Sequence, residues 1–312
     1  MRKKHFLFAS VLALLCGSST LHAQDFKLTS SGYFKNQGVD VMAFDDIYPE
    51  GHQGGVCIIM NGHRVATNGD IRLEATPGQW QPVPKQLDRK LGDNSITATL
   101  CYPDSSRHLT GFNPMIYPDL HLIYTVNVES KGKNIEVTVD LDRPIPQEFI
   151  GKVGFNLEFF PGSLFGKPWI MDGQSGIFPQ QPNSPLMTTQ PNYLHTGNYH
   201  DGKKSLADMD KLIGKGYSPI VADDIISEPY AKGRKFTSRP DDPYNKVTIE
   251  SLSGDLQLFD GRMNHNNGWF VLRSNIKPGV TKGAVKWIIT PNVVADWMYQ
   301  PVIQTSQIGY HP

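Results

Sequence analysis

The alternation of apolar and polar residues in short runs, each closed by tight-turn residues, restricts the fold of this chain more than any other feature. In "HLIYTVNVESKGKNIEVTVDLDRP" two runs flank a tip centred on Gly132, and every second residue from Ile135 to Leu141 is apolar. In "GGVCIIMNGHRVAT" an apolar run turns at Asn61 and Gly62, two residues that tolerate positive φ, and then returns. Both patterns predict antiparallel hairpins.

The same patterning recurs along the rest of the chain. It predicts further strands at 153–160, 246–251, 256–259, 269–273 and 284–289. Helix signals are few, and "KKSLADMDKLIGKG" and "TPNVVADW" each predict no more than a short helix. From 161 to 245 the residues Pro, Gly, Asn and Asp dominate, which predicts a loop-rich insertion. The predicted fold class is therefore all-β, an antiparallel β-sandwich with long loop insertions and few short helices.

The composition is that of a globular chain without a nucleic-acid-binding face. Of the 312 residues, 39% are hydrophobic, which is ample for a packed core. The 30 basic residues balance 30 acidic ones and do not cluster, so we expect no nucleic-acid partner. Cys-His metal spacing is absent, and His195 and His200 are better explained as solvated loop residues than as metal ligands. We expect neither a metal nor another cofactor.

The first residues, "MRKKHFLFASVLALLCGSSTLHAQ", have the three parts of a secretory signal: a basic start, an apolar stretch and a small residue before the cut. The signal peptide covers 1–23, with cleavage after Ala23. Lipoprotein processing at Cys16 is the less favoured alternative, because the bulky Leu15 precedes it. The apolar stretch is too short to span a membrane, so we expect no transmembrane segment in a mature chain that is secreted, periplasmic or extracellular.

Two cysteines, Cys57 and Cys101, remain after this cleavage. Each lies in an apolar run that is typical of a strand, where buried free cysteines are common. Because the expected compartment permits disulfides, a bridge between the two strands is the alternative. Pairing requires a specific geometry that the sequence does not give, so both alternatives stay open.

Carboxylate pairs are the first candidates for hydrolytic chemistry. Glycoside hydrolysis needs two carboxyl groups that face one bond, and adjacent acids occur at 45–46, 223–224 and 241–242. Neighbouring residues on a strand point to opposite faces, and acidic pairs close to Pro are ordinary turn formers. We therefore favour turns at these positions. A Gly-X-Ser-X-Gly nucleophile motif is also absent.

Aromatic residues in loops are candidates for sugar binding, because a flat ring can stack on the C–H face of a pyranose. Trp80 in "TPGQWQPVP" and Trp169 in "FGKPWIMDG" both lie among Pro and Gly, where an exposed ring is expected. Trp287, in "AVKWIIT", is instead expected in the core. The alternative for the loop tryptophans is that they close the ends of the sandwich.

The segment "DGRMNHNNGWFV" is a second candidate for sugar contacts. Its amides and guanidinium would donate hydrogen bonds to hydroxyls, and the candidate residues are Arg262, Asn264, His265 and Trp269. The favoured alternative is structural, because Asn-Asn-Gly is typical of a hairpin tip and Trp269 would then begin the next strand.

Four stretches of the sequence are informative together: "GVDVMAFDDIYPEGHQGG", "NGHRVATNGDIRLEATPGQWQPVP", "FNLEFFPGSLFGKPWIMDGQSGIFPQQPN" and "DGRMNHNNGWFVLRS". They resemble the N-terminal region of large secreted bacterial glycoside hydrolases of family 9, the cellulase-like enzymes. "SQIGYHP", at the end of the chain, is similar to the first strand of the immunoglobulin-like module in that family. The resemblance implies a supersandwich-like accessory domain at 24–300, and a linker with the first strand of an immunoglobulin-like domain at 301–312.

The resemblance implies a function but no catalytic residue. The catalytic base motif of the family, Asp-Ala-Gly-Asp, does not occur in this sequence. We therefore expect a non-catalytic β-sandwich module of a secreted, endoglucanase-like glycoside hydrolase acting on β-glucan-class polysaccharide. Its expected partners are the polysaccharide and the immunoglobulin-like and helical-barrel catalytic domains of the same polypeptide. The alternatives are a free-standing carbohydrate-binding protein and, below it, a supersandwich sugar epimerase, for which His121, Glu136 and Glu158 are individual candidates.

Overall fold

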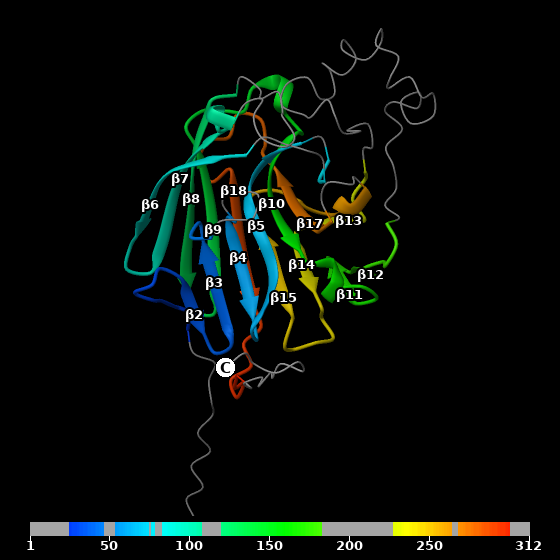
Figure 1. Cartoon of the computed structure of the whole chain (residues 1–312). Coiled ribbons are helices and arrows are strands. Elements are labelled where there is room, and N and C mark those ends of the chain that lie inside the picture. The colour runs from blue at the N-terminus through cyan, green and yellow to red at the C-terminus, as the bar shows by residue number, and fades with distance from the viewer. Residues whose placement is uncertain are drawn as a thin grey trace, which may run out of the picture.

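The computed structural model describes residues 25–46, 54–74, 76–78, 83–107, 120–182, 227–263 and 268–299 (Figure 1). The predicted signal peptide, with its cut after Ala23, and the predicted segment 301–312 lie outside these residues and remain predictions. His195 and His200 also lie outside them. No helix within the described ranges is long and apolar enough to cross a membrane.

The chain forms two antiparallel sheets of nine strands each, and the first sheet contains strands from both ends of the chain. In spatial order this sheet consists of β1 (Lys27–Leu28), β2 (Phe34–Asn36), β3 (Val39–Ala43), β4 (Val56–Met60), β5 (His63–Leu73), β10 (Val153–Phe159), β17 (Phe270–Asn275), β16 (Leu256–Asp260) and β13 (Ala231–Gly233).

The second sheet packs against the first (Figure 1). Its spatial order is β12 (Gln174–Ile177), β11 (Pro168–Met171), β14 (Lys235–Ser238), β15 (Val247–Ser251), β18 (Val285–Pro291), β9 (Asn134–Leu141), β8 (Leu122–Lys131), β7 (Ser95–Tyr102) and β6 (Lys85–Leu91). The helical elements described are short 3-10 turns at Ser105–Arg107, Gln147–Phe149, Pro161–Ser163 and Gly261–Met263. The predicted class, an all-β antiparallel sandwich, is confirmed.

Both hairpins read from the sequence are present. β4 and β5 meet at Asn61 and Gly62, whose φ angles of 52° and 82° require residues that tolerate the left-handed region. β8 and β9 pair from Tyr124↔Leu141 to Lys131↔Asn134, with Gly132 at a φ of 63° in the tip. The turn chemistry therefore sets the register, which places alternate apolar residues on the face toward the other sheet.

The core lies between the two sheets and is filled from alternate strand positions. Trp287 of β18 is fully buried, as its apolar sequence context predicted, and its ring meets Phe155 of β10 edge-on at 5.0 Å. Its indole Nε1 donates to the hydroxyl oxygen of Ser274 at 3.0 Å, so burial leaves this polar group paired. These contacts join the middle strands of the two sheets.

Two segments differ in detail from the sequence-based expectation. The described parts of the predicted loop-rich insertion 161–245 also contain four short strands: β11, β12 and β14 at the end of the second sheet, and β13 beside β16. "TPNVVADW" was expected to give a helical turn from Pro291. Pro291 is instead the last residue of β18, and the turn is formed later, where the Trp297 N–H donates to the Val294 carbonyl at 3.1 Å.

The two cysteines are both free thiols, so the disulfide alternative is wrong. Cys57 lies in β4 between the core residues Val56 and Ile58, and Cys101 lies in β7 between Leu100 and Tyr102. Because successive strand residues point to opposite faces, each thiol points away from the interior, on a different sheet. The two sulfur atoms therefore cannot meet.

Candidate functional site

The middle strands of the first sheet are buried on both faces, although only one face belongs to the core. In the pairing of β5 with β10, Ile71 lies opposite Phe155, whereas Asp70 lies opposite Asn156. The face that carries Asp70 and Asn156 is rich in charged and amide side chains, all nearly inaccessible. We call it the polar face, and its residues are Thr67, Asn68, Asp70, Arg72, Glu74, Asn156, Glu158 and Arg273. Buried charge is costly, so this face is the first candidate for a site.

A β-bulge shapes the polar face. The register between β10 and β5 shifts between Asn156↔Asp70 and Glu158↔Thr67, so that three steps along β5 correspond to two along β10. Asn68 takes a φ of 55° in this bulge. Gly69 lies so close to β4 that a Cβ placed there would be 2.6 Å from the Cβ of Val56. The Asn-Gly pair therefore lets β5 bend and brings its polar residues together.

The second sheet contributes two tyrosines where β5 runs past its neighbour. The pairing of β4 with β5 reaches Gly69, and Asp70 to Leu73 extend beyond it. Here the Tyr124 hydroxyl donates to Asp70 Oδ1 at 2.8 Å, and the Leu73 N–H donates to the Tyr102 hydroxyl oxygen at 3.1 Å. Both tyrosines are fully buried, so this end of the polar face is tied to the opposite sheet.

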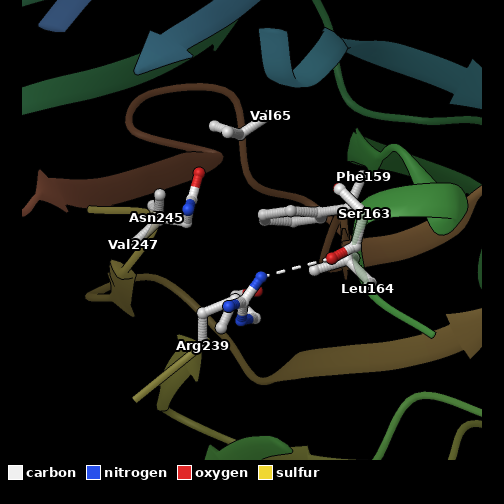
Figure 2. Close-up of a pocket in the computed structure, with 8 residues that line it drawn as sticks. Val65, Phe159, Ser163, Leu164, Arg239, Asn245 and Val247 are labelled. Atoms are coloured by element: carbon white, nitrogen blue, oxygen red, sulfur yellow. Dashed lines mark hydrogen bonds between the residues drawn. The ribbon is translucent and has the colours of Figure 1, made fainter. Parts of the chain in front are cut away.

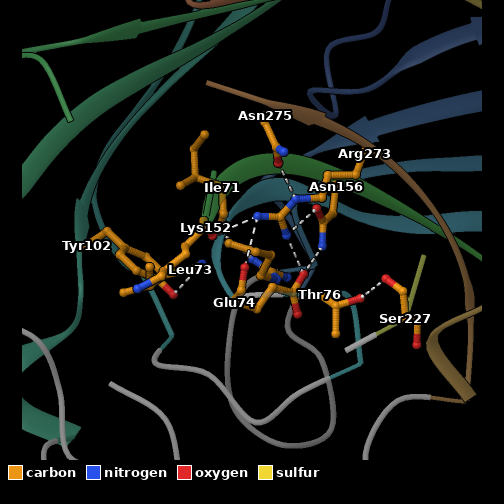
Figure 3. A network of polar contacts seen from close by, with 11 residues as sticks. Ile71, Leu73, Glu74, Thr76, Tyr102, Lys152, Asn156, Ser227, Arg273 and Asn275 are labelled. Carbon is orange, nitrogen blue, oxygen red and sulfur yellow. Dashed lines mark hydrogen bonds and ion pairs between the residues drawn. The ribbon is translucent and has the colours of Figure 1, made fainter. Parts of the chain in front are cut away.

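The Arg273 guanidinium organises one half of the polar face (Figure 3). Its Nε donates to Asn275 Oδ1 at 2.7 Å, its Nη1 to Glu74 Oε1 at 2.8 Å, and its Nη2 to the Lys152 carbonyl oxygen at 2.7 Å. Asn156 Nδ2 also donates to Glu74 Oε1, at 2.5 Å. Every nitrogen of the guanidinium has a partner, so this network holds β5, β10 and β17 together rather than offering free groups.

The other half of the polar face contains oxygen atoms that lack a hydrogen bond of ordinary length. We call it the bulge cluster: Thr67, Asn68, Asp70, Arg72, Glu158 and, from β8, Tyr124. Asn68 Nδ2 donates to Glu158 Oε2 at 2.7 Å, and Arg72 Nη1 donates to the Ile71 carbonyl oxygen at 3.1 Å.

Within the described part of the chain, three buried oxygens of the bulge cluster lack a hydrogen bond of ordinary length: Thr67 Oγ1, Asn68 Oδ1 and Asp70 Oδ2. Of these, Thr67 still interacts with the Cys57 thiol. Arg72 Nη1 lies 3.6 Å from Asp70 Oδ2, which is an ion pair but too long for a hydrogen bond. An unpaired buried polar atom costs about 1–3 kcal/mol. The bulge cluster is therefore the part of the polar face whose hydrogen-bonding capacity is least satisfied.

The environment of the bulge cluster also changes its acid–base properties. Burial raises the pKa of the Asp70 carboxyl to about 6, although the Arg72 guanidinium and the hydrogen bond from Tyr124 oppose this shift. Burial, together with the negative charge of Asp70, raises the pKa of the Tyr124 hydroxyl well above its ordinary value. Tyr124 is therefore a neutral donor at neutral pH, and Asp70 titrates in the mildly acidic range.

The bulge cluster is suited to a ligand that carries several hydroxyl groups. Each hydroxyl donates one hydrogen bond and accepts others, and the cluster places acceptor oxygens beside a guanidinium. Among the residues that the structure describes, no group of three or more His, Cys, Asp and Glu side chains is arranged to hold a metal ion. The donor set thus points to hydrogen-bonding recognition of a small polar molecule.

A cavity elsewhere in the described structure is far too small for a ligand with several hydroxyl groups. It has a volume of about 10 Å³, room for about one water molecule, and is lined by Phe159, Leu164 and Val247 among others (Figure 2). Arg239 at its edge donates from Nη1 to the Ser163 carbonyl oxygen at 3.2 Å and from Nη2 to Asp242 Oδ2 at 2.6 Å. This cavity is a packing gap.

The predicted sugar-binding residues do not come together in the described structure. Trp80, Asn264 and His265 lie outside the described residues. Trp169 was expected in an exposed loop, but it belongs to β11 and is 6% exposed, because its ring lies over Gly176 of β12. Trp169 therefore belongs to the core cluster and not to an exposed loop.

The other two predicted residues of "DGRMNHNNGWFV" have structural contacts. Arg262 forms two hydrogen bonds of 2.8 Å to the Asp260 carboxylate and donates to the carbonyl oxygens of Pro179 and Gln180. Its guanidinium also lies over the Phe270 ring at 4.5 Å. Trp269 is half-buried and meets Phe160 edge-on at 4.3 Å. These contacts occupy the groups that would have bound sugar.

Of the three residues considered for epimerase chemistry, Glu158 alone belongs to the polar face. Glu136 lies on the other sheet, where Lys131 Nζ pairs with it at 2.6 Å, and His121 is exposed at the start of β8. The acid pair at 241–242 lies in a turn, where Asp242 Oδ1 accepts from the Tyr244 N–H at 2.8 Å. The pair at 223–224 lies outside the described residues.

Sequence reasoning missed Asn68, Asp70 and Arg72. Their signal was present in "TNGDIRLE", where acidic and basic residues alternate with apolar ones, and where an Asn-Gly pair interrupts a strand without ending it. A charged residue at every second strand position is typical of a solvent face, and only the structure shows that this face is buried.

The comparisons with known proteins add a distant likeness of fold. No protein-family model matches this chain, and no curated protein sequence does. Three solved structures are similar to it at low TM-score. The Slr1438 protein from Synechocystis sp. is 10% identical, with a TM-score of 0.35 over 86% of this chain and 96% of that chain.

The other two structures are described as related to galactose mutarotase. One is a galactose mutarotase-like protein from Lactobacillus casei, 12% identical, with a TM-score of 0.37 over 82% of this chain and 97% of that chain. The second, a galactose mutarotase related enzyme from Lactobacillus acidophilus, is 9% identical, with a TM-score of 0.34 over 83% and 96%. Likeness at this level assigns neither an activity nor a ligand to this chain.

Proposed function

We propose that this chain is a saccharide-binding β-sandwich module and that the bulge cluster is its site. One observation carries the proposal: three buried oxygens that lack a hydrogen bond of ordinary length, on Thr67, Asn68 and Asp70, belong to one cluster with the guanidinium of Arg72. A sugar carries several hydroxyl groups, each of which can donate a hydrogen bond to an acceptor oxygen of this kind. Its binding would thereby remove the cost of leaving them unpaired.

The wider setting of the module comes from the sequence and remains part of the proposal. The resemblance to family 9 glycoside hydrolases favours a non-catalytic module that assists a secreted enzyme acting on β-glucan-class polysaccharide. The signal-like N-terminus agrees with secretion. In this role the chain binds saccharide and leaves hydrolysis to a catalytic domain, so the purified chain should release no reducing sugar from cellulose or xyloglucan.

Binding of mono- and oligosaccharides to the purified chain, measured by isothermal titration calorimetry, tests the site. Asp70→Asn keeps the size of the side chain and an acceptor for Tyr124, whereas Arg72→Lys keeps the positive charge but not the forked guanidinium. We expect each variant to weaken binding about tenfold or more, because an acceptor becomes a donor or the forked guanidinium is lost.

The ion pair between Arg234 and Asp255 supplies the matched control. It has the same residue types at 3.2 Å, but its side chains are 50% and 64% exposed and lie outside the polar face. Arg234→Lys and Asp255→Asn should leave binding unchanged. Equal losses in both pairs, or saccharide binding that survives Asp70→Asn and Arg72→Lys, would contradict the assignment of the site.

A sugar epimerase is the second candidate, and the bulge cluster gives it specific support. Asp70, with a pKa of about 6, accepts a hydrogen bond from Tyr124, and an acid that titrates near neutral pH beside a phenol is suited to proton transfer. Polarimetry of freshly dissolved glucose and galactose separates the two candidates. Accelerated mutarotation that Asp70→Asn abolishes would establish the epimerase, whereas binding without acceleration supports the module.

A further inference from the structure

The two oxygens of the Asp70 carboxyl have different surroundings. Oδ1 accepts hydrogen bonds from the Tyr124 hydroxyl at 2.8 Å and from the Ile71 N–H at 2.7 Å. A carboxylate oxygen has two lone pairs, so these two donors occupy Oδ1. Oδ2 is buried and lacks a hydrogen bond of ordinary length, with Arg72 Nη1 at 3.6 Å. Oδ2 is therefore the oxygen of Asp70 that has acceptor capacity left.

This difference also decides where a proton binds to Asp70. A protonated carboxyl carries its hydrogen on one oxygen, which then becomes a donor. A proton on Oδ1 would point against the hydrogens that Tyr124 and Ile71 already donate there. A proton on Oδ2 disturbs neither bond. The neutral carboxyl therefore carries its proton on Oδ2, which is the same atom that a ligand hydroxyl group needs as an acceptor.

The groups around Asp70 set the range in which this proton binds. The charged and titratable side chains in or beside the bulge cluster come from five strands: Cys57 of β4, Arg72 and Glu74 of β5, Tyr102 of β7, Tyr124 of β8 and Glu158 of β10. Arg72 and Tyr124 stabilise the carboxylate, but burial outweighs them and raises the pKa of Asp70 to about 6.

The other neighbours do not replace Asp70 in this role. Burial raises the pKa of the Cys57 thiol to about 11 and that of the Tyr124 hydroxyl well above its ordinary value, so both stay protonated in mildly acidic solution. Burial also raises the pKa of Glu74, but its Oε1 accepts hydrogen bonds from Arg273 and Asn156. Among these carboxyls, Asp70 is the one with a buried oxygen that lacks a hydrogen bond of ordinary length.

We propose that a proton and a saccharide hydroxyl group compete for Oδ2 of Asp70, so that the bulge cluster releases its ligand in mildly acidic solution. This inference rests on the proposed function, because it concerns the regulation of the same site. At neutral pH the carboxylate accepts the hydrogen of the ligand hydroxyl. In acid the O–H bond at Oδ2 must first break, and its proton passes to the buffer before the ligand binds.

Isothermal titration calorimetry of the purified chain at about pH 5 and about pH 7.5 tests this competition, with glucose, galactose and cellobiose as probes. We expect Kd to be about tenfold higher at the lower pH, since about nine-tenths of the Asp70 carboxyl is then protonated. At about pH 6, titrations in two buffers with different heats of ionisation should show the release of about half a proton per ligand.

Three variants assign the effect to Asp70. Binding by Asp70→Asn, where it is still measurable, should not change between the two pH values, because the amide does not titrate. Tyr124→Phe removes a donor that lowers the pKa of Asp70, so the loss of affinity should begin at a higher pH. Tyr230→Phe is the matched control. Its hydroxyl donates to the buried Asp260 at 2.9 Å, beside β16, and its loss should leave the pH dependence unchanged.

The possible failures are distinguishable. Binding that is equally tight at both pH values and releases no proton would overturn the competition while leaving the bulge cluster as a binding site. The same would follow from a pH dependence that persists in Asp70→Asn, or from equal shifts in Tyr124→Phe and Tyr230→Phe. If none of the three probes binds at either pH, the proposed function itself is contradicted, and the competition with it.

Discussion

Asp70 connects the stability of the fold to the proposed site. Its carboxyl is fully buried, holds a hydrogen bond from Tyr124 through one oxygen, and leaves the other without a hydrogen bond in the described structure. Burial raises its pKa from 3.8 to about 6, more than the nearby Arg72 lowers it. Folding therefore makes the charged form of the Asp70 carboxyl less favourable than it is in the unfolded chain. The charged carboxylate is the form that accepts hydrogen bonds from a ligand through both of its oxygens.

This shift predicts a pH dependence of stability. Between pH 4 and 6 the folded state holds a proton on Asp70 that the unfolded chain releases, so the contribution of Asp70 to the free energy of unfolding falls as pH rises. The fall amounts to about 3 kcal/mol over the whole window. Urea denaturation at a series of pH values should show it, and Asp70→Asn should lack this component.

Comparing the natural chain with the Asp70→Asn variant separates the contribution of Asp70 from those of other titratable groups. Glu74 has a raised pKa in the same network and adds to the same trend in both proteins. Asp140 and Asp242 have lowered pKa values, with hydrogen bonds from Gly283 and Asn245 that stabilise the charge, and they act in the opposite direction in both. Parallel curves for natural chain and variant across this window would contradict the prediction.

The bulge in β5 decides where the polar side chains point. If β5 kept regular alternation through every residue from Thr67 to Asp70, Asp70 and Arg72 would point toward the core in place of Ile71 and Leu73. The bend depends on the close approach of Gly69 to Val56 of β4. The bulge at Gly69 thus lets the residues after it keep their apolar side chains on the core face and their polar side chains on the polar face.

Gly69→Ala tests this dependence. Its new Cβ would meet the Val56 Cβ at 2.6 Å and the Val56 carbonyl oxygen at 3.0 Å, and both belong to a paired strand. We expect a loss of about 1–3 kcal/mol in the free energy of unfolding from overpacking, and weaker binding at the bulge cluster. Chemical denaturation gives the first quantity and calorimetry the second.

Gly162→Ala is the control for this substitution. A Cβ at Gly162 would have no atom within 4 Å, so the change should stay within about 0.5 kcal/mol. A Gly69→Ala chain as stable as Gly162→Ala would show that β4 moves aside without cost and that the bulge does not require glycine.

The two sheets are joined by packing and hydrogen bonds and not by a covalent link. Phe155 and Trp287 meet across the interior, and Tyr124 reaches from the second sheet to Asp70 of the first. Burial raises the pKa of the Cys57 thiol to about 11, which keeps it protonated and unreactive at neutral pH. The stability of the sandwich therefore does not depend on the redox state of its surroundings.

A thermal-unfolding experiment with and without reducing agent tests this statement. A disulfide between the sheets would contribute about 2–4 kcal/mol, and its reduction would lower Tm by several degrees. We expect no change in Tm. In the folded chain a thiol reagent should modify the half-buried Cys101 before Cys57, and a single slow, simultaneous modification of both would disagree with their different burial.

The sequence alone determined the fold class, most of the strands and both principal hairpins. These follow from local physics, because a period of two and residues that tolerate positive φ, such as Asn61 and Gly62, act within a few residues of each other. Burial of Trp287 followed in the same way from its apolar neighbours. The tertiary structure alone decided which polar strand face is buried, because the burial of such a face depends on the segments that fold over it.

The clearest cases are Trp169 and Asp70. Trp169 has loop-like neighbours in the sequence, but pairing with distant β14 turns it into a core residue. Asp70 has the alternating pattern of a solvent face, yet it is buried and hydrogen-bonded to a tyrosine 54 residues away. Local sequence sets which residues alternate, whereas only long-range packing sets which of the two faces meets water.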